Sequence, residues 1–460
     1  MAAPVVARIL RWNSYNVPGR IRITEYYFEV PRDYSNPNSS QTITLFARAG
    51  HRIHKPADPT TVAPHQPWML FLQGGPGFGC SSPQNNAWTQ SVLDRGYQVL
   101  LLDQRGTGMS TPLSAASLGL RGDEKVQAQY LKSFRADSIV RDCEAVRLAL
   151  TSGLPPEKQK WSVMGQSYGG FCILSYLSFA PQGLREAFLF GGLQPLVDDP
   201  DRVYRATFKK LIERNEAYYN KFPEDIQRVQ RITTFLQRFG NTTVKDTSDS
   251  GFMTARRFMQ LGMAFGFHSG LDSIHDIVIR ADNDLTCFGT LTRPTISRIE
   301  GYLPFNDAII YAILHESIYC QGKSSKWSAY RIQKEHEKLF QIPKENPTNP
   351  IYFTGEMIFP WMFEDYGELT RIKDQADFVA EFSDWPALFD RAQLKRNEVP
   401  VYAASYTDDM FVDFELSMET ARAIKGCKTY VTNQMYHDAL RSRMDEVFKA
   451  LWALRDDSID

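Results

Sequence analysis

Short apolar and β-branched runs recur along the chain and predict eight strands. They lie at Ile21–Val30, Thr42–Ala49, Trp68–Leu72, Gln98–Leu102, Trp161–Met164, Ala187–Phe190, Val401–Ser405 and Thr429–Thr432. Several of them, such as Trp68–Leu72, are continuously apolar instead of alternating, which is typical of strands covered on both faces by helices. The pattern therefore predicts an α/β sheet that is mostly parallel.

Helical periodicity separates some of these strands. An apolar stripe runs from Ile139 to Leu150 between the fourth and fifth predicted strands, and Asp137 is placed to cap the start of that helix. The first two predicted strands have no helical pattern between them and are expected to form an antiparallel hairpin. The sheet is thus predicted to begin antiparallel and to continue through helical crossovers.

The character of the chain changes between residues 194 and 396. Charged amphipathic stretches such as Arg202–Lys221 and Ile226–Phe239 replace the strand runs there. We predict an α/β core made of residues 1–193 and 397–460, with a mainly helical cap of residues 194–396 inserted between strands six and seven. An independent second domain is the alternative, but it would leave the last two strands without the sheet that they complete.

A sharp strand-to-helix turn is predicted at Gly165–Gly170, which reads G-Q-S-Y-G-G and follows the apolar run Trp161–Met164. In such a nucleophile elbow, bulky side chains do not fit two residues before and after the central serine, which explains Gly165 and Gly169. The turn lifts the serine oxygen above the sheet, and the following helix directs its N-terminal N–H groups toward it. Ser167 is therefore the candidate nucleophile.

A nucleophilic serine needs a base and an acid that orients the base. In the chain order of α/β-hydrolases the acid follows a strand beyond the cap, and the histidine follows the last strand. His437 comes just after Thr429–Thr432 and is the candidate base. Two acids, Asp408 and Asp409, follow Val401–Ser405; we favour Asp409, because apolar residues follow it directly, and Asp408 remains an alternative.

A glycine-rich loop, Gln73-Gly74-Gly75-Pro76-Gly77-Phe78-Gly79, follows the third predicted strand. Glycines there let the backbone approach a substrate and turn an N–H group toward it. The backbone N–H groups of Gly75 and Tyr168 would together form a two-donor oxyanion hole. A phosphate-binding loop is disfavoured, because Pro76 lacks an N–H group and no G-K-[ST] follows.

Charge and cysteine usage narrow the class of protein. The 52 Lys and Arg residues nearly balance the 53 Asp and Glu residues, so no basic surface indicates a nucleic acid or an anionic membrane as partner. No apolar run reaches transmembrane length, and the N-terminus does not resemble a secretory signal. The six cysteines are widely spaced, which is typical of reduced thiols in a cytoplasmic enzyme.

The motifs Q-G-G-P-G, D-Q-R-G-T-G-M-S, G-Q-S-Y-G-G, Y-T-D-D and a late H-D together resemble the proline iminopeptidase (prolyl aminopeptidase) family of α/β-hydrolase serine peptidases. The resemblance covers the whole core. The sequence differs from the family pattern at Gln73, where the commoner family form has histidine. This difference is compatible with a shifted position of the glycine-rich loop or of the substrate pocket. The resemblance implies an enzyme without metal or cofactor that removes an N-terminal proline from peptides.

Removing an N-terminal proline implies a cation site for the free imino group and a small apolar pocket for its ring. The helix around Glu316 resembles the glutamate-bearing cap helix of the family, which makes Glu316 the first candidate for the cation site and Glu356 the second. Phe359 and Trp361 are candidates for the ring pocket. His315 and Glu316 do not begin a zinc motif, because H-E-x-x-H fails at Tyr319.

Two other functions remain open from the sequence. A carboxylesterase or lipase would use the same serine, acid and histidine, and would not depend on the cap glutamates. A catalytically silent hydrolase-fold binding protein would not react through Ser167. The presence of Ser167 together with Asp409 and His437 argues against such a protein.

Overall fold

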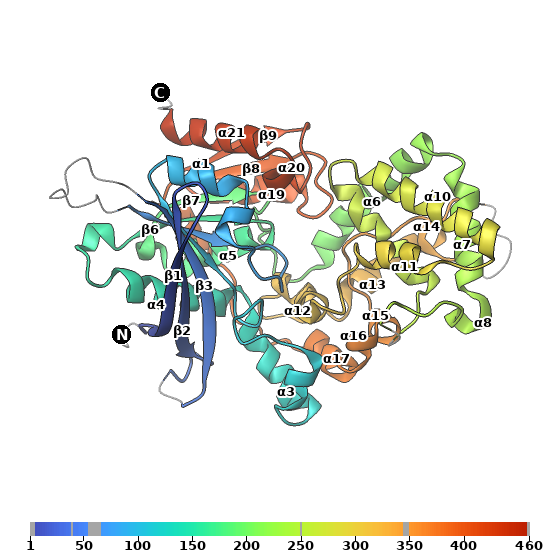
Figure 1. The fold of residues 1–460 in the computed structure, drawn as a ribbon, viewed down its shortest axis with the longest axis horizontal. Coiled ribbons are helices and arrows are strands. Elements are labelled where there is room, and N and C mark those ends of the chain that lie inside the picture. The colour runs from blue at the N-terminus through green and yellow to red at the C-terminus, as the bar shows by residue number, and fades with distance from the viewer. Residues whose placement is uncertain (1–4, 38–39, 54–65, 249–250, 344–348, 458–460) are drawn as a thin grey trace.

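The computed structural model describes residues 5–37, 40–53, 66–248, 251–343 and 349–457, and they contain a nine-stranded sheet (Figure 1). The order across the sheet is β1-β2-β3-β5-β4-β6-β7-β8-β9. The strands are β1 (Arg8–Val17), β2 (Ile21–Pro31), β3 (Thr42–Arg52), β4 (Trp68–Leu72), β5 (Gln98–Leu102), β6 (Trp161–Gln166), β7 (Leu184–Phe190), β8 (Val401–Tyr406) and β9 (Cys427–Thr432).

The sheet is antiparallel at one edge and parallel elsewhere. β1, β2, β3 and β5 pair antiparallel in that order, and the predicted hairpin is β2 with β3. All pairs from β5 to β9 are parallel, which confirms the prediction of a mostly parallel sheet. The predicted number of eight strands is wrong, because β1 was missed. Every residue of β1 is at least partly exposed, so the strand lacks the alternation of buried and exposed positions that marks a strand in a sequence.

The central strands are buried on both faces, as their continuous apolar runs predicted. Alternate residues of β4 belong to different cores: Leu70 packs with α4 and α5, whereas Phe71 packs with α1 and α21. These helices are α1 (Trp88–Asp94), α4 (Ala136–Thr151), α5 (Tyr168–Phe179) and α21 (Met444–Asp456).

The start of helix α4 differs from the sequence prediction. The helix begins at Ala136, after Arg135, and no side chain caps it. The predicted capping by Asp137 is therefore wrong. Asp137 lies inside the first turn, where its negative charge interacts favourably with the positive end of the helix dipole.

Residues 191–400 separate β7 from β8 and are mainly helical, which confirms the prediction of a large helical insertion. In Figure 1 the helices α6, α7 and α10 form a lobe beside the sheet, and α12 lies between the lobe and the sheet. We keep the word cap for residues 194–396, and the two predicted domain boundaries, at 193/194 and 396/397, stay predictions. The helices of the insertion include α6 (Asp201–Lys221), α7 (Asp225–Leu236), α10 (Gly270–Phe288), α11 (Arg293–Glu300), α12 (Ile309–Leu314), α13 (Ser328–Gln333) and α17 (Lys373–Glu381).

The remaining α-helices belong partly to the core and partly to the insertion. They are α2 (Ala115–Gly119), α3 (Glu124–Leu131), α8 (Arg238–Asn241), α9 (Ala255–Met259), α14 (Glu337–Phe340), α15 (Met362–Asp365), α16 (Gly367–Thr370), α18 (Arg391–Lys395), α19 (Phe414–Ala423) and α20 (Ala439–Ser442). Within the described ranges, no helix combines the length and the apolar character that a membrane crossing requires. All six cysteines are free thiols.

Candidate active site

Ser167 lies in a strained turn between β6, which ends at Gln166, and α5, which begins at Tyr168. Its φ of 55° and ψ of −125° are rarely adopted by residues other than glycine. Two backbone hydrogen bonds hold the turn: the N–H of Ser167 donates to the Phe190 carbonyl at 3.1 Å, and its carbonyl accepts from Gly170 at 2.8 Å. The geometry is that of the nucleophile elbow predicted from the sequence.

The glycines of the turn are required by close backbone approach. A Cβ atom on Gly169 would lie 1.9 Å from the carbonyl oxygen of Leu72, at the end of β4. A Cβ atom on Gly165 would lie 2.5 Å from the carbonyl carbon of Gly169. Any side chain at these two positions would therefore push α5 away from the sheet and displace Ser167.

His437 and Asp409 form a buried pair at the carboxyl ends of β8 and β9. The Nδ1 atom of His437 lies 2.8 Å from Oδ2 of Asp409. The second oxygen, Oδ1, accepts the backbone N–H groups of Phe411 at 2.8 Å and Val412 at 3.0 Å. The carboxylate is thus fixed on both oxygens and holds the Nδ1 edge of the imidazole.

Asp408 points elsewhere, although it is the neighbour of Asp409. Its side chain is 43% exposed, and Oδ1 lies 3.5 Å from Nζ of Lys210 in α6. Of the two acids that the sequence left open, the structure brings Asp409 to the histidine and places Asp408 against the cap.

Two contacts with the cap position the loop that carries His437. The backbone N–H of His437 donates to the carbonyl of Gly266 at 3.2 Å. The backbone N–H of His268 donates to Oδ1 of Asp438 at 3.0 Å, and the Nδ1 atom of the same histidine lies 2.8 Å from that oxygen. Asp438, the second residue of the H-D motif, therefore attaches the histidine loop to the cap.

The charge around His437 favours its protonated form. Burial lowers the pKa of His437, but the charge and the hydrogen bond of Asp409 and the charge of Glu356 outweigh burial and the opposing charge of Arg441. The pKa of His437 therefore lies above its ordinary value of about 6.5. Such an imidazole accepts a proton readily, as a general base must.

Ser167 and His437 line one cavity of about 360 Å³, together with residues of the cap. The glycine-rich loop forms one wall with Gly74 and Gly75. The loop packs closely on both sides: a Cβ atom on Gly74 would lie 3.2 Å from Cβ of Ser167, and one on Gly77 would lie 2.9 Å from the backbone nitrogen of Tyr311 in α12. Tyr168 is the first residue of α5, so its N–H has no partner within the helix.

Glu356 supplies a carboxylate to the same cavity from the cap. Its Oε2 accepts the hydroxyl of Tyr311 at 2.8 Å and lies 3.6 Å from Nε2 of His315. Burial raises the pKa of Glu356, but the charges of His315 and His437 and the hydrogen bonds from His315 and Tyr311 outweigh burial, so the pKa lies below its ordinary range. The cavity thus contains an anion close to the candidate nucleophile.

The chain is similar over nearly its whole length to two curated proteins. It is 45% identical over 454 residues to "Proline iminopeptidase aneH" of Aspergillus aculeatus, covering 99% of this chain and 98% of that one. It is 38% identical over 438 residues to "Proline iminopeptidase" of Aeromonas sobria, covering 95% and 97%. The family described as the alpha/beta hydrolase fold matches residues 67–243. This chain belongs to the proline iminopeptidase family of α/β-hydrolases.

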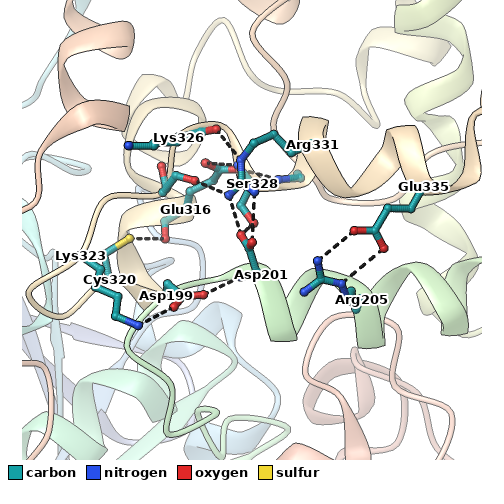
Figure 2. A network of polar contacts seen from close by, with 12 residues as sticks. Asp199, Asp201, Arg205, Glu316, Cys320, Lys323, Lys326, Ser328, Arg331 and Glu335 are labelled. Atoms are coloured by element: carbon teal, nitrogen blue, oxygen red, sulfur yellow. Dashed lines mark hydrogen bonds and ion pairs between the residues drawn. The ribbon is translucent and has the colours of Figure 1, made fainter.

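Membership of the proline iminopeptidase family confirms the resemblance found in the motifs, but the structure places one predicted cap residue outside the cavity. Glu316 is buried, and its carboxylate accepts the backbone N–H groups of Ser328 at 3.1 Å and Ala329 at 2.8 Å at the start of α13 (Figure 2). Burial raises the pKa of Glu316, and these hydrogen bonds oppose the shift. The contacts of Glu316 are those of a residue that stabilises a helix start.

The turn of the cap helix explains why Glu316 misses the cavity. Tyr311 and His315 are four residues apart, so they share one helical face, and their rings lie 4.9 Å apart beside Glu356. Glu316 is the next residue and points about 100° away from that face. His315, not Glu316, is thus the residue that joins Tyr311 beside Glu356, and no motif in the sequence marks it.

The predicted aromatic pocket residues also lie outside the cavity lining of this proline iminopeptidase homologue. Phe359 is fully buried and stacks on Trp361 with ring centroids 5.5 Å apart, and the guanidinium of Arg256 lies over the Trp361 ring. The apolar lining comes instead from four different parts of the chain: Phe78, Met263, Phe267, Phe305 and Phe411. Of these residues, Phe78 belongs to the glycine-rich loop marked in the sequence, and Phe411 follows the acidic pair Asp408-Asp409 by two residues.

Proposed function

We propose that this chain is a serine aminopeptidase that releases N-terminal proline from peptides. One observation carries the proposal: a single cavity contains Ser167, His437 and the carboxylate of Glu356, whose side chain is only 15% exposed. The first two residues suit acyl transfer, and the carboxylate suits the positive imino group of a free N-terminus. The two full-length relatives, both named proline iminopeptidase, support the same activity.

The proposed reaction uses residues of the core. Ser167 attacks the carbonyl carbon of the N-terminal proline while His437 removes the hydroxyl proton, and Asp409 stabilises the imidazolium. The backbone N–H groups of Gly75 and Tyr168 are proposed to bind the oxyanion. The C–N bond then breaks, His437 protonates the leaving amine, and water activated by His437 hydrolyses the prolyl ester and regenerates Ser167.

The proposed recognition of proline uses residues of the cap. Glu356 remains ionised in the cavity, because His315, His437 and Tyr311 favour its charged form. A protonated imino group would pair with this carboxylate, and the pyrrolidine ring would contact the apolar lining that includes Phe305 and Phe411. Neither Glu316 nor Trp361 takes part in this proposal, because neither lines the cavity.

The test of this function compares three substrates. We expect proline p-nitroanilide to be cleaved at least about 100-fold faster in kcat/KM than its N-acetyl derivative, because acetylation removes the positive charge that Glu356 would bind. A carboxylesterase would instead hydrolyse a neutral p-nitrophenyl ester and show no preference for the free imino group. Equal rates on the free and acetylated anilides would overturn the aminopeptidase function.

Glu356→Gln is expected to raise KM for proline p-nitroanilide by roughly 10- to 150-fold, since a charge-assisted hydrogen bond contributes about 1.5–3 kcal/mol. The substitution should raise KM and leave kcat nearly unchanged, because the imino group would be bound equally in the substrate complex and in the transition state. Steady-state kinetics of the purified variant measure it.

Glu316→Gln is the matched control. It removes the other predicted cap carboxylate but leaves the cavity lining unchanged, so KM should change less than about twofold. Its expected effect is a lower Tm, since a backbone N–H group at the start of α13 loses a charged acceptor. Equal KM effects of the two variants would contradict the role of Glu356.

We also propose a cytoplasmic location. The six free cysteines, several of them buried in the core, are compatible with a reducing compartment.

A further inference from the structure

Arg441 lines the active-site cavity, but neither the triad nor the imino site uses it. It lies in α20, four residues after His437, and its side chain is exposed. Within the described part of the chain, its guanidinium has no hydrogen-bonding or ionic partner. Arg443, two residues further, is paired with Glu446 at 3.2 Å and does not line the cavity.

The cavity therefore carries two charges of opposite sign. Glu356 is the anion, half-buried and held by Tyr311, and Arg441 is the cation at the exposed part of the lining. The charge of Arg441 acts on His437, whose pKa it lowers against the larger effect of Asp409. Arg441 lines the same cavity as Ser167 and His437, so it faces the space in which the substrate would be cleaved.

We propose that Arg441 binds the C-terminal carboxylate of short substrates, so that the preferred substrates are dipeptides with an N-terminal proline and a free carboxylate. The inference rests on the proposed aminopeptidase function. A guanidinium binds a carboxylate through two parallel hydrogen bonds, which gives geometric selectivity as well as affinity. The dipeptide would pair its imino group with Glu356 and its carboxylate with Arg441, on either side of the carbonyl attacked by Ser167.

The length of a peptide residue limits this arrangement to short substrates. In a dipeptide the carboxylate lies within one residue of the scissile bond, and each added residue moves it about 3.3–3.6 Å further away. Ser167 and Arg441 line a cavity of only about 360 Å³, so a longer chain would carry its carboxylate out of this space. Amidation of the dipeptide would remove the charge without changing its length.

The experiment measures kcat/KM for Pro-Ala and for Pro-Ala amide in the wild type, Arg441→Gln, Arg441→Glu and the control Arg443→Gln. The wild type should prefer the free acid by about tenfold or more, through a lower KM. Arg441→Gln should bring the ratio of the two substrates close to one, and Arg441→Glu should reverse it. Arg443→Gln should keep the wild-type ratio.

The ratio of kcat/KM for Pro-Ala to that for Pro-Ala amide distinguishes carboxylate binding by Arg441 from an indirect effect of Arg441 on His437. Any change in the pKa of His437 after loss of the Arg441 charge alters both substrates alike and cancels in the ratio. A wild-type ratio near one, or an unchanged ratio in Arg441→Gln, overturns the inference while proline p-nitroanilide is still cleaved. A wild type that releases no proline from the anilide overturns the proposed function, and the role of Arg441 with it.

Discussion

Ser167→Ala is expected to lower kcat for proline release from proline p-nitroanilide by roughly 10⁴- to 10⁶-fold. The substitution removes the oxygen that forms the prolyl ester, and the strained turn offers no other nucleophile at the same place. KM should change little, because Glu356 and the apolar lining remain. A fluorophosphonate probe should label the wild type and leave the variant unlabelled, which gives a second readout that does not depend on the substrate.

Ser178→Ala is the control for this variant. Ser178 lies on the same helix, α5, and its hydroxyl donates to the carbonyl of Leu174 at 2.8 Å, away from the cavity. Its loss should leave kcat within about twofold of the wild type. If Ser167→Ala kept most of the activity while folded, as shown by circular dichroism, the assignment of the nucleophile would be wrong. A wild type that the probe does not label would favour a silent binding protein.

Local rules of chain geometry made the core predictable from sequence. The elbow at Gly165–Gly170 requires small residues wherever backbones meet, and the structure shows those approaches at Leu72 and Gly169. The loops after strands of a parallel sheet meet at one edge, so residues far apart in sequence were correctly expected to converge there. The strand β1 was not predicted from the sequence, because it lies at the sheet edge and is exposed on both faces.

The cap was less predictable, because its geometry depends on how helices pack and not on a strand order. The sequence showed a glutamate next to His315 but not which of the two residues faces the core. Consecutive helical residues point about 100° apart, so one of the two faces the cavity and the other faces the start of α13. Both side chains are buried, so burial alone does not distinguish them. Phe305 and Met263 likewise reach the cavity only through the fold of the cap, and no motif marks them.

The cap also contacts the loops that carry the candidate catalytic residues. Gly266 and His268 contact the loop of His437, and Tyr311 packs against the glycine-rich loop near Ser167. The same segments therefore carry the proposed substrate-binding groups and contact the loops of the candidate catalytic residues. A mutation in the cap that shifts these contacts is expected to change kcat as well as KM, since small displacements of a catalytic group are costly.

Asp409→Asn is expected to lower kcat by about 10⁴-fold with little change in fold, as loss of the acid does in other serine hydrolase triads. The amide keeps the size of the side chain, but it no longer accepts the Nδ1–H of His437 as an anion, and it can present its own N–H to the ring. The imidazole then adopts the wrong tautomer for accepting the proton of Ser167. Steady-state kinetics on proline p-nitroanilide measure the loss.

The pH profile gives a second signature of Asp409. Its charge is the largest influence raising the pKa of His437, so the acid limb of kcat/KM should lie above pH 6.5 in the wild type and move to lower pH in Asp409→Asn. Activity falls below that limb because a protonated imidazole cannot act as the base.

Asp408→Asn provides the matched comparison, since it makes the same chemical change one residue earlier. Asp408 is 43% exposed, and its nearest cation is Lys210 at 3.5 Å, so the ion pair contributes at most about 1 kcal/mol to stability. The variant should retain kcat within about twofold and keep the wild-type pH limb. A loss of about 10⁴-fold in Asp408→Asn with an active Asp409→Asn would reverse the assignment, because only the residue that holds the imidazole affects both its tautomer and its pKa.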